Sequence, residues 1–146
     1  MDPDLLCLPE AESLLMNNLQ AGGEFFLEIF CGCAAITLAC MMINVPCTRL
    51  WDSKFGEQFN VLTCGYVIVQ LILAKRVVAL HFATPCQSLT WARSPQLRSA
   101  LYPNGLPGLN PLQQTLVDYG NELVAFTVEC CELLHSMGGV LLSRKP

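Results

Sequence analysis

Residues 77–90 have the sequence Val-Val-Ala-Leu-His-Phe-Ala-Thr-Pro-Cys-Gln-Ser-Leu-Thr. The first part is an apolar run with β-branched side chains, which is typical of a strand buried on both faces of a parallel sheet. Pro85 ends this run because proline has no backbone N–H and favours an extended conformation in the preceding residue. We therefore expect Cys86 in the loop just beyond the carboxyl end of the strand, where open α/β sheets bind their ligands.

A strand, a turn of small residues and a helix are predicted near the start of the chain. Residues 25–30 form a compact apolar run, Cys31-Gly32-Cys33-Ala34-Ala35 follows as a turn, and residues 36–44 form an apolar helix. This order begins a βαβ unit. Residues 46–51 supply a second short strand, with Asp52 directly after its end.

The remaining elements continue the alternation of strands and helices. In chain order they are helix 9–20, a brief strand near Val61, helix 66–75, helix 112–137 and a strand that begins at 140–142. Residues 88–110 contain prolines and turn-forming dipeptides, so they are expected to form a functional or disordered loop. The pattern predicts an α/β fold with a mostly parallel open sheet and helices on both faces.

Charge is distributed unevenly along the chain. The 146 residues are 53% hydrophobic, enough for one globular core, and the net charge of −4 argues against a generally basic nucleic-acid binder. Residues 58–117, however, contain no acidic residue. Their basic residues are Lys75, Arg76, Arg93 and Arg98, a local charge of +4 around Cys86. This patch could meet phosphates, or it could be four scattered solvated side chains.

The nine cysteines do not have the spacing of a small disulfide scaffold, and the opening residues do not resemble a signal peptide. We therefore expect reduced thiols in an intracellular protein. The pairs Cys31/Cys33 and Cys130/Cys131 lack the two-residue spacer of a zinc site, so no metal is expected. Most of the thiols are interpreted as small hydrophobic core residues.

A membrane span has to be considered for Ile29 to Thr48. These twenty residues carry no charge, and about twenty apolar residues cross a bilayer as a helix. Gly32, Asn44 and Pro46 interrupt the segment, which argues against a span. No membrane association is expected, and a small membrane protein stays as an alternative.

Two residues at the predicted carboxyl edge of the sheet carry candidate chemistry. Asp52 stands twenty positions after Gly32, a spacing at which a carboxylate commonly holds the ribose hydroxyls of a nucleotide-type ligand. An ordinary loop aspartate is the alternative. Cys86 lies in a span without carboxylates, with Arg93 nearby, and could act as a nucleophile. A buried inert thiol is the alternative there.

Taken together, these motifs resemble the cytosine-C5 DNA methyltransferase family. The residues that carry the resemblance are Glu28-Ile29-Phe30-Cys31-Gly32, Trp51-Asp52, and Ala83-Thr84-Pro85-Cys86-Gln87 followed by Ser88 and Thr90. The resemblance implies a Rossmann-like S-adenosylmethionine methyltransferase fold that is incomplete at the C-terminus, because it covers about the front half of the family's catalytic domain. It divides the chain into an N-terminal helical extension, 1–24, and a partial methyltransferase-like domain, 25–146.

The resemblance also implies a site for S-adenosyl-L-methionine. Gly32 would let the cofactor approach the backbone, Asp52 would accept from its ribose, and Trp51 would lie against its adenine. Asn60 stands where the family carries an aspartate that contacts the adenine amino group. The implied cofactor-binding residues are Phe30, Cys31, Gly32, Trp51, Asp52, Asn60 and Pro85.

On the nucleic-acid side, Cys86 matches the family's nucleophile, which attacks cytosine C6 so that C5 can take a methyl group. The base must first be flipped out of the duplex. Thr90 stands where the family has a serine that contacts phosphate, and Gln87 and Arg93 are further candidates for nucleic-acid contacts.

The chain departs from the family in several places. Ala34 and Ala35 replace glycines, and Asn60 replaces an acid. After the last strand, Arg144-Lys145-Pro146 stands where the family has a Glu-Asn dipeptide whose glutamate contacts cytosine N3. One such contact is typically worth about 10² to 10⁴ in rate. Weak or no activity alone is therefore expected, with a partner chain as one source of the missing half.

Three functions remain open from the sequence. The first is a DNA (cytosine-5-)-methyltransferase-like protein, with DNA as the partner and RNA as the alternative, located in the nucleus or nucleoid. The second is a non-catalytic interaction or regulatory module on a Rossmann-like fold. The third is the small membrane protein.

Overall fold

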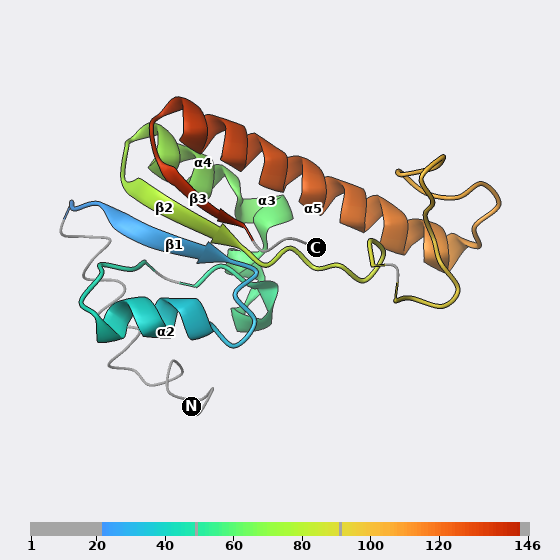
Figure 1. Cartoon of the computed structure of the whole chain (residues 1–146), viewed down its shortest axis with the longest axis horizontal. Helices are drawn as coiled ribbons and strands as arrows, with labels where there is room; N and C mark the ends of the chain where they lie inside the picture. Colours follow the sequence, from blue (N-terminus) through green and yellow to red (C-terminus); the bar gives the residue numbers. More distant parts are fainter. Residues whose placement is uncertain (1–21, 49, 91, 144–146) are drawn as a thin grey trace.

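The computed structural model describes residues 22–48, 50–90 and 92–143. Three parallel strands form its sheet, in the order β1 (Phe25–Ile29), β2 (Val77–Phe82) and β3 (Val140–Ser143) (Figure 1). The predicted strands 25–30, 77–82 and 140–142 are confirmed. The predicted helix 9–20 lies outside the described residues.

Cys47 and Trp51 lie beside β1 without belonging to a regular strand. Isolated parallel bridges join Cys47 to Phe26 and Trp51 to Ile29. Backbone hydrogen bonds support the alignment, since Phe26 N donates to the carbonyl of Pro46 at 2.8 Å. The predicted second strand is therefore present only as these two bridges.

Helices fill the connections between the strands. They are α2 (Ala35–Met42), the single turns η2 (Ser53–Phe55) and η3 (Glu57–Phe59), α3 (Val61–Cys64), α4 (Tyr66–Leu73) and α5 (Pro111–Ser136). The predicted helices 36–44, 66–75 and 112–137 are confirmed, with ends that differ by at most two residues. The predicted strand near Val61 is wrong, because Asn60 caps a helix there by accepting a hydrogen bond from the Leu62 N–H at 3.1 Å.

Successive side chains of β1 point to opposite faces of the sheet, and helices pack against both faces. Phe25, Leu27 and Ile29 point into the main core, where they are joined by Ile68 and Ile72 of α4 and by Leu123, Cys130 and Leu134 of α5. Phe26 points to the opposite face and packs with Cys47 and α2. Figure 1 shows α2 on one side of the sheet and α4 and α5 on the other. The predicted two-faced α/β arrangement is confirmed.

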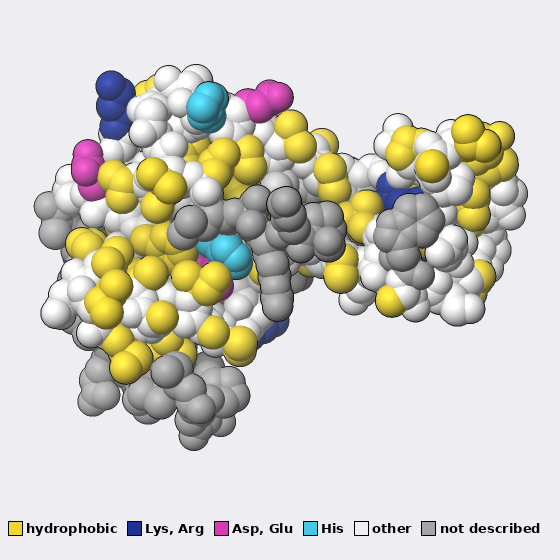
Figure 2. Space-filling view, in the orientation of Figure 1, with side chains coloured by type: hydrophobic (Ala, Val, Ile, Leu, Met, Phe, Trp, Pro, Cys, Tyr) yellow, Lys and Arg dark blue, Asp and Glu magenta, His cyan; other side chains and the backbone are white. Residues whose placement is uncertain are grey.

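The connection from β2 to α5 forms a lobe beside this body. Residues 88–110 contain no helix or strand at the positions that the structure describes, as predicted. Figure 2 shows the lobe joined to the body by a narrower waist. Leu101 and Tyr102 in this region are 85% and 49% exposed, so the lobe presents apolar side chains to solvent.

Within the described ranges, no helix combines the length and apolar character required to cross a membrane. Residues 29–48 begin at the end of β1 and contain the eight-residue helix α2. The single unbroken helix that the membrane alternative requires is therefore wrong.

Candidate functional site

Two turns leave the sheet side by side at its carboxyl edge. Ile29 and Phe82 are register partners at the ends of β1 and β2, and the Ala83 N–H donates to the Ile29 carbonyl at 3.1 Å. β1 leads into residues 30–34, which we call the Gly32 turn. β2 leads into residues 83–90, which we call the Cys86 elbow. Because neighbouring strands lie about 4.8 Å apart, both turns open on the same rim.

The Gly32 turn has left-handed backbone at alternate residues. Phe30, Gly32 and Ala34 have φ values of 57°, 54° and 52°. Glycine adopts this conformation without strain, whereas Phe30 and Ala34 are held in it by their surroundings: both are buried, and the Phe30 N–H donates to the Trp51 carbonyl at 2.7 Å. Ala34 therefore has a backbone conformation that glycine favours.

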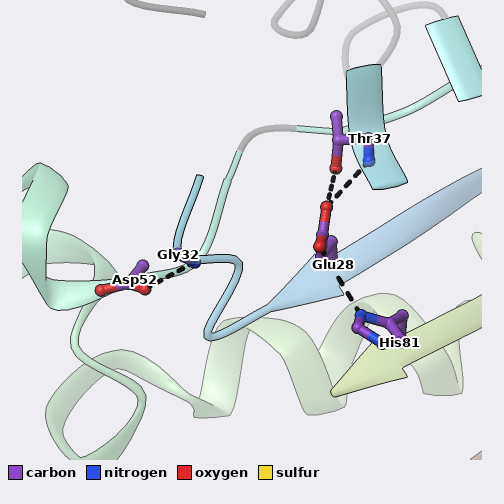
Figure 3. Close-up of polar contacts among 5 residues, drawn as sticks. All are labelled: Glu28, Gly32, Thr37, Asp52 and His81. Atoms are coloured by element: carbon purple, nitrogen blue, oxygen red, sulfur yellow. Dashed lines mark hydrogen bonds and ion pairs between the residues drawn. The ribbon is translucent and has the colours of Figure 1, made fainter. Parts of the chain in front are cut away.

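Asp52 contacts the Gly32 turn directly. Its Oδ2 accepts from the Gly32 N–H at 3.1 Å (Figure 3). Its Oδ1 accepts from the Lys54 N–H at 3.1 Å. A β-carbon added at Gly32 would meet no atom within 4 Å, so the backbone there is open to an approaching group. Each carboxylate oxygen can accept more than one hydrogen bond, so Asp52 can hold the turn and still accept from a ligand hydroxyl.

Trp51 and Asn60 have structural partners that the sequence did not indicate. Trp51 is 7% exposed and packs edge-on against Phe59, with ring centroids 5.9 Å apart. Little of its ring is available to an adenine. Asn60 caps α3 through Oδ1, and its Nδ2 donates to Glu57 at 3.4 Å. Both residues stay near the edge that carries Asp52, but their side chains are already engaged.

Glu28 forms a buried polar contact that sequence analysis did not predict. Its Oε2 accepts from the backbone N–H of Thr37 at 2.8 Å and from the Thr37 hydroxyl at 2.6 Å (Figure 3). Its Oε1 lies 3.6 Å from His81 Nδ1, an ion-pair distance if the histidine is protonated. Glu28 thus joins β1 to the first turn of α2. The only sequence signal was a carboxylate inside an apolar strand.

The thiols at this edge differ in accessibility. Cys31 is 5% exposed, and burial, together with the negative charge of Asp52, raises its pKa to about 12. Burial likewise raises the pKa of Cys47 and Cys130 to about 12. These three thiols stay protonated at neutral pH. Cys86 is exposed, so the alternative that its thiol is buried is wrong.

The Cys86 elbow brings together the residues predicted to contact nucleic acid. The Cys86 carbonyl accepts from the N–H groups of Leu89 and Thr90, both at 2.9 Å. Arg93 Nη1 donates to the Gln87 carbonyl at 3.4 Å, which places the guanidinium beside the elbow. Gln87 is exposed, and Pro85 and Thr90 are partly exposed. Cys86, Gln87, Thr90 and Arg93 therefore form one cluster.

The basic patch around Cys86 is not formed as predicted. Lys75 and Arg76 precede β2, so the six residues of this strand, roughly 20 Å, separate them from the elbow. Arg76 instead donates to the Gly23 carbonyl at 2.6 Å and lies over the Phe25 ring. Of these four residues, Arg93 and Arg98 lie on the elbow side, because β2 separates them from Lys75 and Arg76 at its other end.

Arg98 fastens the lobe to α5 rather than facing solvent. Its Nε donates to the Ser88 carbonyl at 3.0 Å, its Nη1 to Asn121 Oδ1 at 2.7 Å, and its Nη2 to the Val117 carbonyl at 3.0 Å. Burial lowers the pKa of the guanidinium. A cavity of about 270 Å³ lies beside it, between the elbow and residues 96–103. Arg98 is therefore a structural residue of the lobe.

Replacing Arg98 with alanine should make the lobe sensitive to proteases while the sheet stays folded. The substitution removes the charged donor that joins Ser88 to α5 and leaves buried carbonyls unpaired. We expect the rate of chymotryptic cleavage within residues 88–110, where neither Arg98→Ala nor the control below changes a cleavage site, to rise about tenfold or more. Arg93→Ala is the control, because the hydrogen bond of Arg93 to the Gln87 carbonyl does not involve α5. Equal cleavage rates in the two variants would contradict this role for Arg98.

The described residues contain no group of three or more side chains arranged to hold a metal ion. No protein-family model, curated protein or solved structure matches the chain. The geometry of the site is therefore the basis for assigning a function.

Proposed function

We propose that this protein is an S-adenosylmethionine-dependent, DNA (cytosine-5-)-methyltransferase-like protein that is weakly active or inactive alone. The observation that carries the proposal is the position of the Gly32 turn and the Cys86 elbow on one rim of a parallel sheet. Such a reaction needs a cofactor site and a nucleophile. The open backbone at Gly32, with the Asp52 carboxylate in contact, suits the first, and the exposed thiol of Cys86 suits the second. The expected target is cytosine in DNA, with RNA as the alternative.

The residues of the Gly32 turn fit the cofactor. S-adenosylmethionine supplies the methyl group when it is bound. Gly32 offers close backbone approach, and Asp52 offers carboxylate oxygens for the ribose. The buried ring of Trp51 does not fit the adenine contact, so Gly32 and Asp52 are the residues on which binding would depend.

Weak activity follows from the end of β3. Ser143 ends the strand and Arg144 follows, where the family has the glutamate that contacts cytosine N3. A carboxyl group at that position helps the ring to accept the electrons of the attacking thiolate, and its loss typically lowers the rate about 10² to 10⁴-fold. We therefore expect slow adduct formation even where the base reaches Cys86.

Titration with labelled S-adenosylmethionine tests the cofactor site. Wild type should bind at millimolar concentration or below, and Asp52→Ala should bind at least about tenfold more weakly, because one charge-assisted hydrogen bond is typically worth this much. Glu129→Gln is the control, since it removes an exposed carboxylate of α5. Wild type that shows no binding at millimolar cofactor would refute the proposed cofactor site.

A non-catalytic interaction or regulatory module is the second candidate. The engaged side chains of Trp51 and Asn60 favour it, and so does the exposed apolar surface of β3, where Val140 is 57% exposed. Such a module would not bind the cofactor. Its Cys86 would react with iodoacetamide no faster than Cys33, the exposed thiol of the Gly32 turn.

A further inference from the structure

A pair of hydroxyl groups joins α5 to the part of the Cys86 elbow that precedes Cys86. Thr84 Oγ1 lies 3.0 Å from Thr127 Oγ1. The Thr127 hydroxyl donates its one proton to the Leu123 carbonyl at 2.8 Å, so the Thr84 hydroxyl is the donor between the two threonines. Thr84 stands two residues before Cys86. The α5 helix therefore holds the chain directly before the elbow thiol.

A second anchor follows two residues after Cys86. Ser88 is 5% exposed and accepts two hydrogen bonds from Arg98. Nε of Arg98 donates to the Ser88 carbonyl at 3.0 Å, and Nη2 donates to the Ser88 hydroxyl at 3.2 Å. Arg98 is in turn bonded to the Val117 carbonyl of α5. Gly120 makes this approach possible, because a β-carbon there would lie 2.3 Å from Ser88 Oγ.

The chain between the two anchors is only slightly longer than the distance that it spans. Gly120 and Thr127 are seven residues apart on α5, about 10 Å along its axis. Thr84 and Ser88 are four residues apart, which extend to at most about 14 Å. Pro85 has a fixed φ, and the Cys86 carbonyl accepts two backbone hydrogen bonds. The backbone of Cys86 is therefore restrained while its side chain is exposed.

We propose that Thr127 and Thr84 are positioning residues for the Cys86 thiol, acting through the hydroxyl pair that fixes the elbow to α5. This role rests on the proposed function, in which a base approaches the thiol. A nucleophile must be held within a fraction of an ångström of its attack position, and a displacement of about 1 Å can lower a rate about 10²-fold. The anchors supply that restraint without contacting the reacting atoms.

The test uses Thr127→Val, which removes the hydroxyl with little change in shape, and Thr127→Ser, which keeps it. Hydrogen exchange at the amides of Leu89 and Thr90 should become about tenfold faster in Thr127→Val. Adduct formation with a duplex carrying 5-fluorocytosine, in the presence of S-adenosylmethionine, should become about tenfold slower. Thr127→Ser should stay within about twofold of wild type in both measurements. Thr115→Val is the matched control, because Thr115 is also on α5 and donates to a carbonyl four residues earlier, at 3.0 Å, but faces solvent.

Each outcome separates the two proposals. Unchanged exchange in Thr127→Val would refute the anchor, and faster exchange with an unchanged adduct rate would refute its effect on the nucleophile. An equal effect in Thr115→Val would show that a helix threonine, not the hydroxyl pair, is responsible. A wild-type protein that forms no adduct refutes the positioning role, because there is then no attack for the thiol to be positioned for, and the exchange rates decide the anchor alone. The proposed function is decided separately, by the titration with labelled S-adenosylmethionine.

Discussion

Replacing Cys86 with serine should abolish the covalent complex between this protein and a DNA duplex that carries 5-fluorocytosine. We expect the rate of adduct formation to fall at least about 10³-fold, because a serine hydroxyl is a far weaker nucleophile than a thiolate. The measurement is a shift to the mass of protein plus DNA in the presence of S-adenosylmethionine. The wild-type protein should show the shift slowly, over hours, because Arg144 and not a glutamate follows β3.

The chemistry explains why the fluorinated base is the probe. In the proposed reaction the thiol would lose its proton, the sulfur would form a bond to C6, and the electron pair of the C5–C6 double bond would bond C5 to the methyl group. The methyl–sulfur bond of the sulfonium would break in the same step and leave a neutral thioether. With cytosine, a base removes the C5 proton and the C–S bond breaks, which restores the double bond and frees the thiolate. With fluorine at C5 this elimination is blocked, so the C–S bond persists.

The neighbouring exposed thiol provides the control for this experiment. Cys33 lies in the Gly32 turn on the same rim and is also exposed. Cys33→Ser should keep the adduct within about twofold of wild type. An adduct that survives in Cys86→Ser, or that peptide mapping places on Cys33, would contradict the assignment of Cys86 as nucleophile.

The strands and the long helix could be predicted because their signals are local. Phe25–Ile29 and Val77–Phe82 are short apolar runs, and α5 is ended by Gly138, whose φ of 82° suits glycine. The spacing of Gly32 and Asp52 placed both residues at one edge of the sheet, because the intervening helix returns the chain there, but the hydrogen bond between them was not predicted. These features depend on sequence order alone.

Other features depend on partners that the sequence does not identify. The apolar residues from Val61 suggested a strand, but the Asn60 cap decides in favour of a helix. The four basic residues seemed to surround Cys86 in sequence, but β2 carries Lys75 and Arg76 to its other end. Trp51 looked available for stacking, and its burial against Phe59 could not be predicted without the packing of η3.

Glu28 is the clearest example of such a partner, and its replacement with alanine should lower the free energy of unfolding by about 3 kcal/mol. The α2 helix begins after Ala34, which has no side chain that can cap it. Glu28 takes the place of a cap from the adjacent strand, because its Oε2 accepts from the third N–H of the helix and from the Thr37 hydroxyl. Glu28→Ala would leave both buried donors unsatisfied, at about 1 to 3 kcal/mol each.

Two variants separate this role from the loss of a charge. Glu28→Gln keeps an oxygen that can accept both hydrogen bonds and should lose only about 1 kcal/mol, whereas Glu24→Ala removes an exposed carboxylate just before β1 and should change stability by less than about 0.5 kcal/mol. Urea unfolding at unchanged m-value is the measurement. If the Glu28→Ala and Glu24→Ala variants had the same free energy of unfolding, α2 would be held by its apolar face alone. If Glu28 is the cap, its loss should also weaken cofactor binding without any contact to the cofactor, because the start of α2 fixes Ala34 and with it the left-handed backbone of the Gly32 turn.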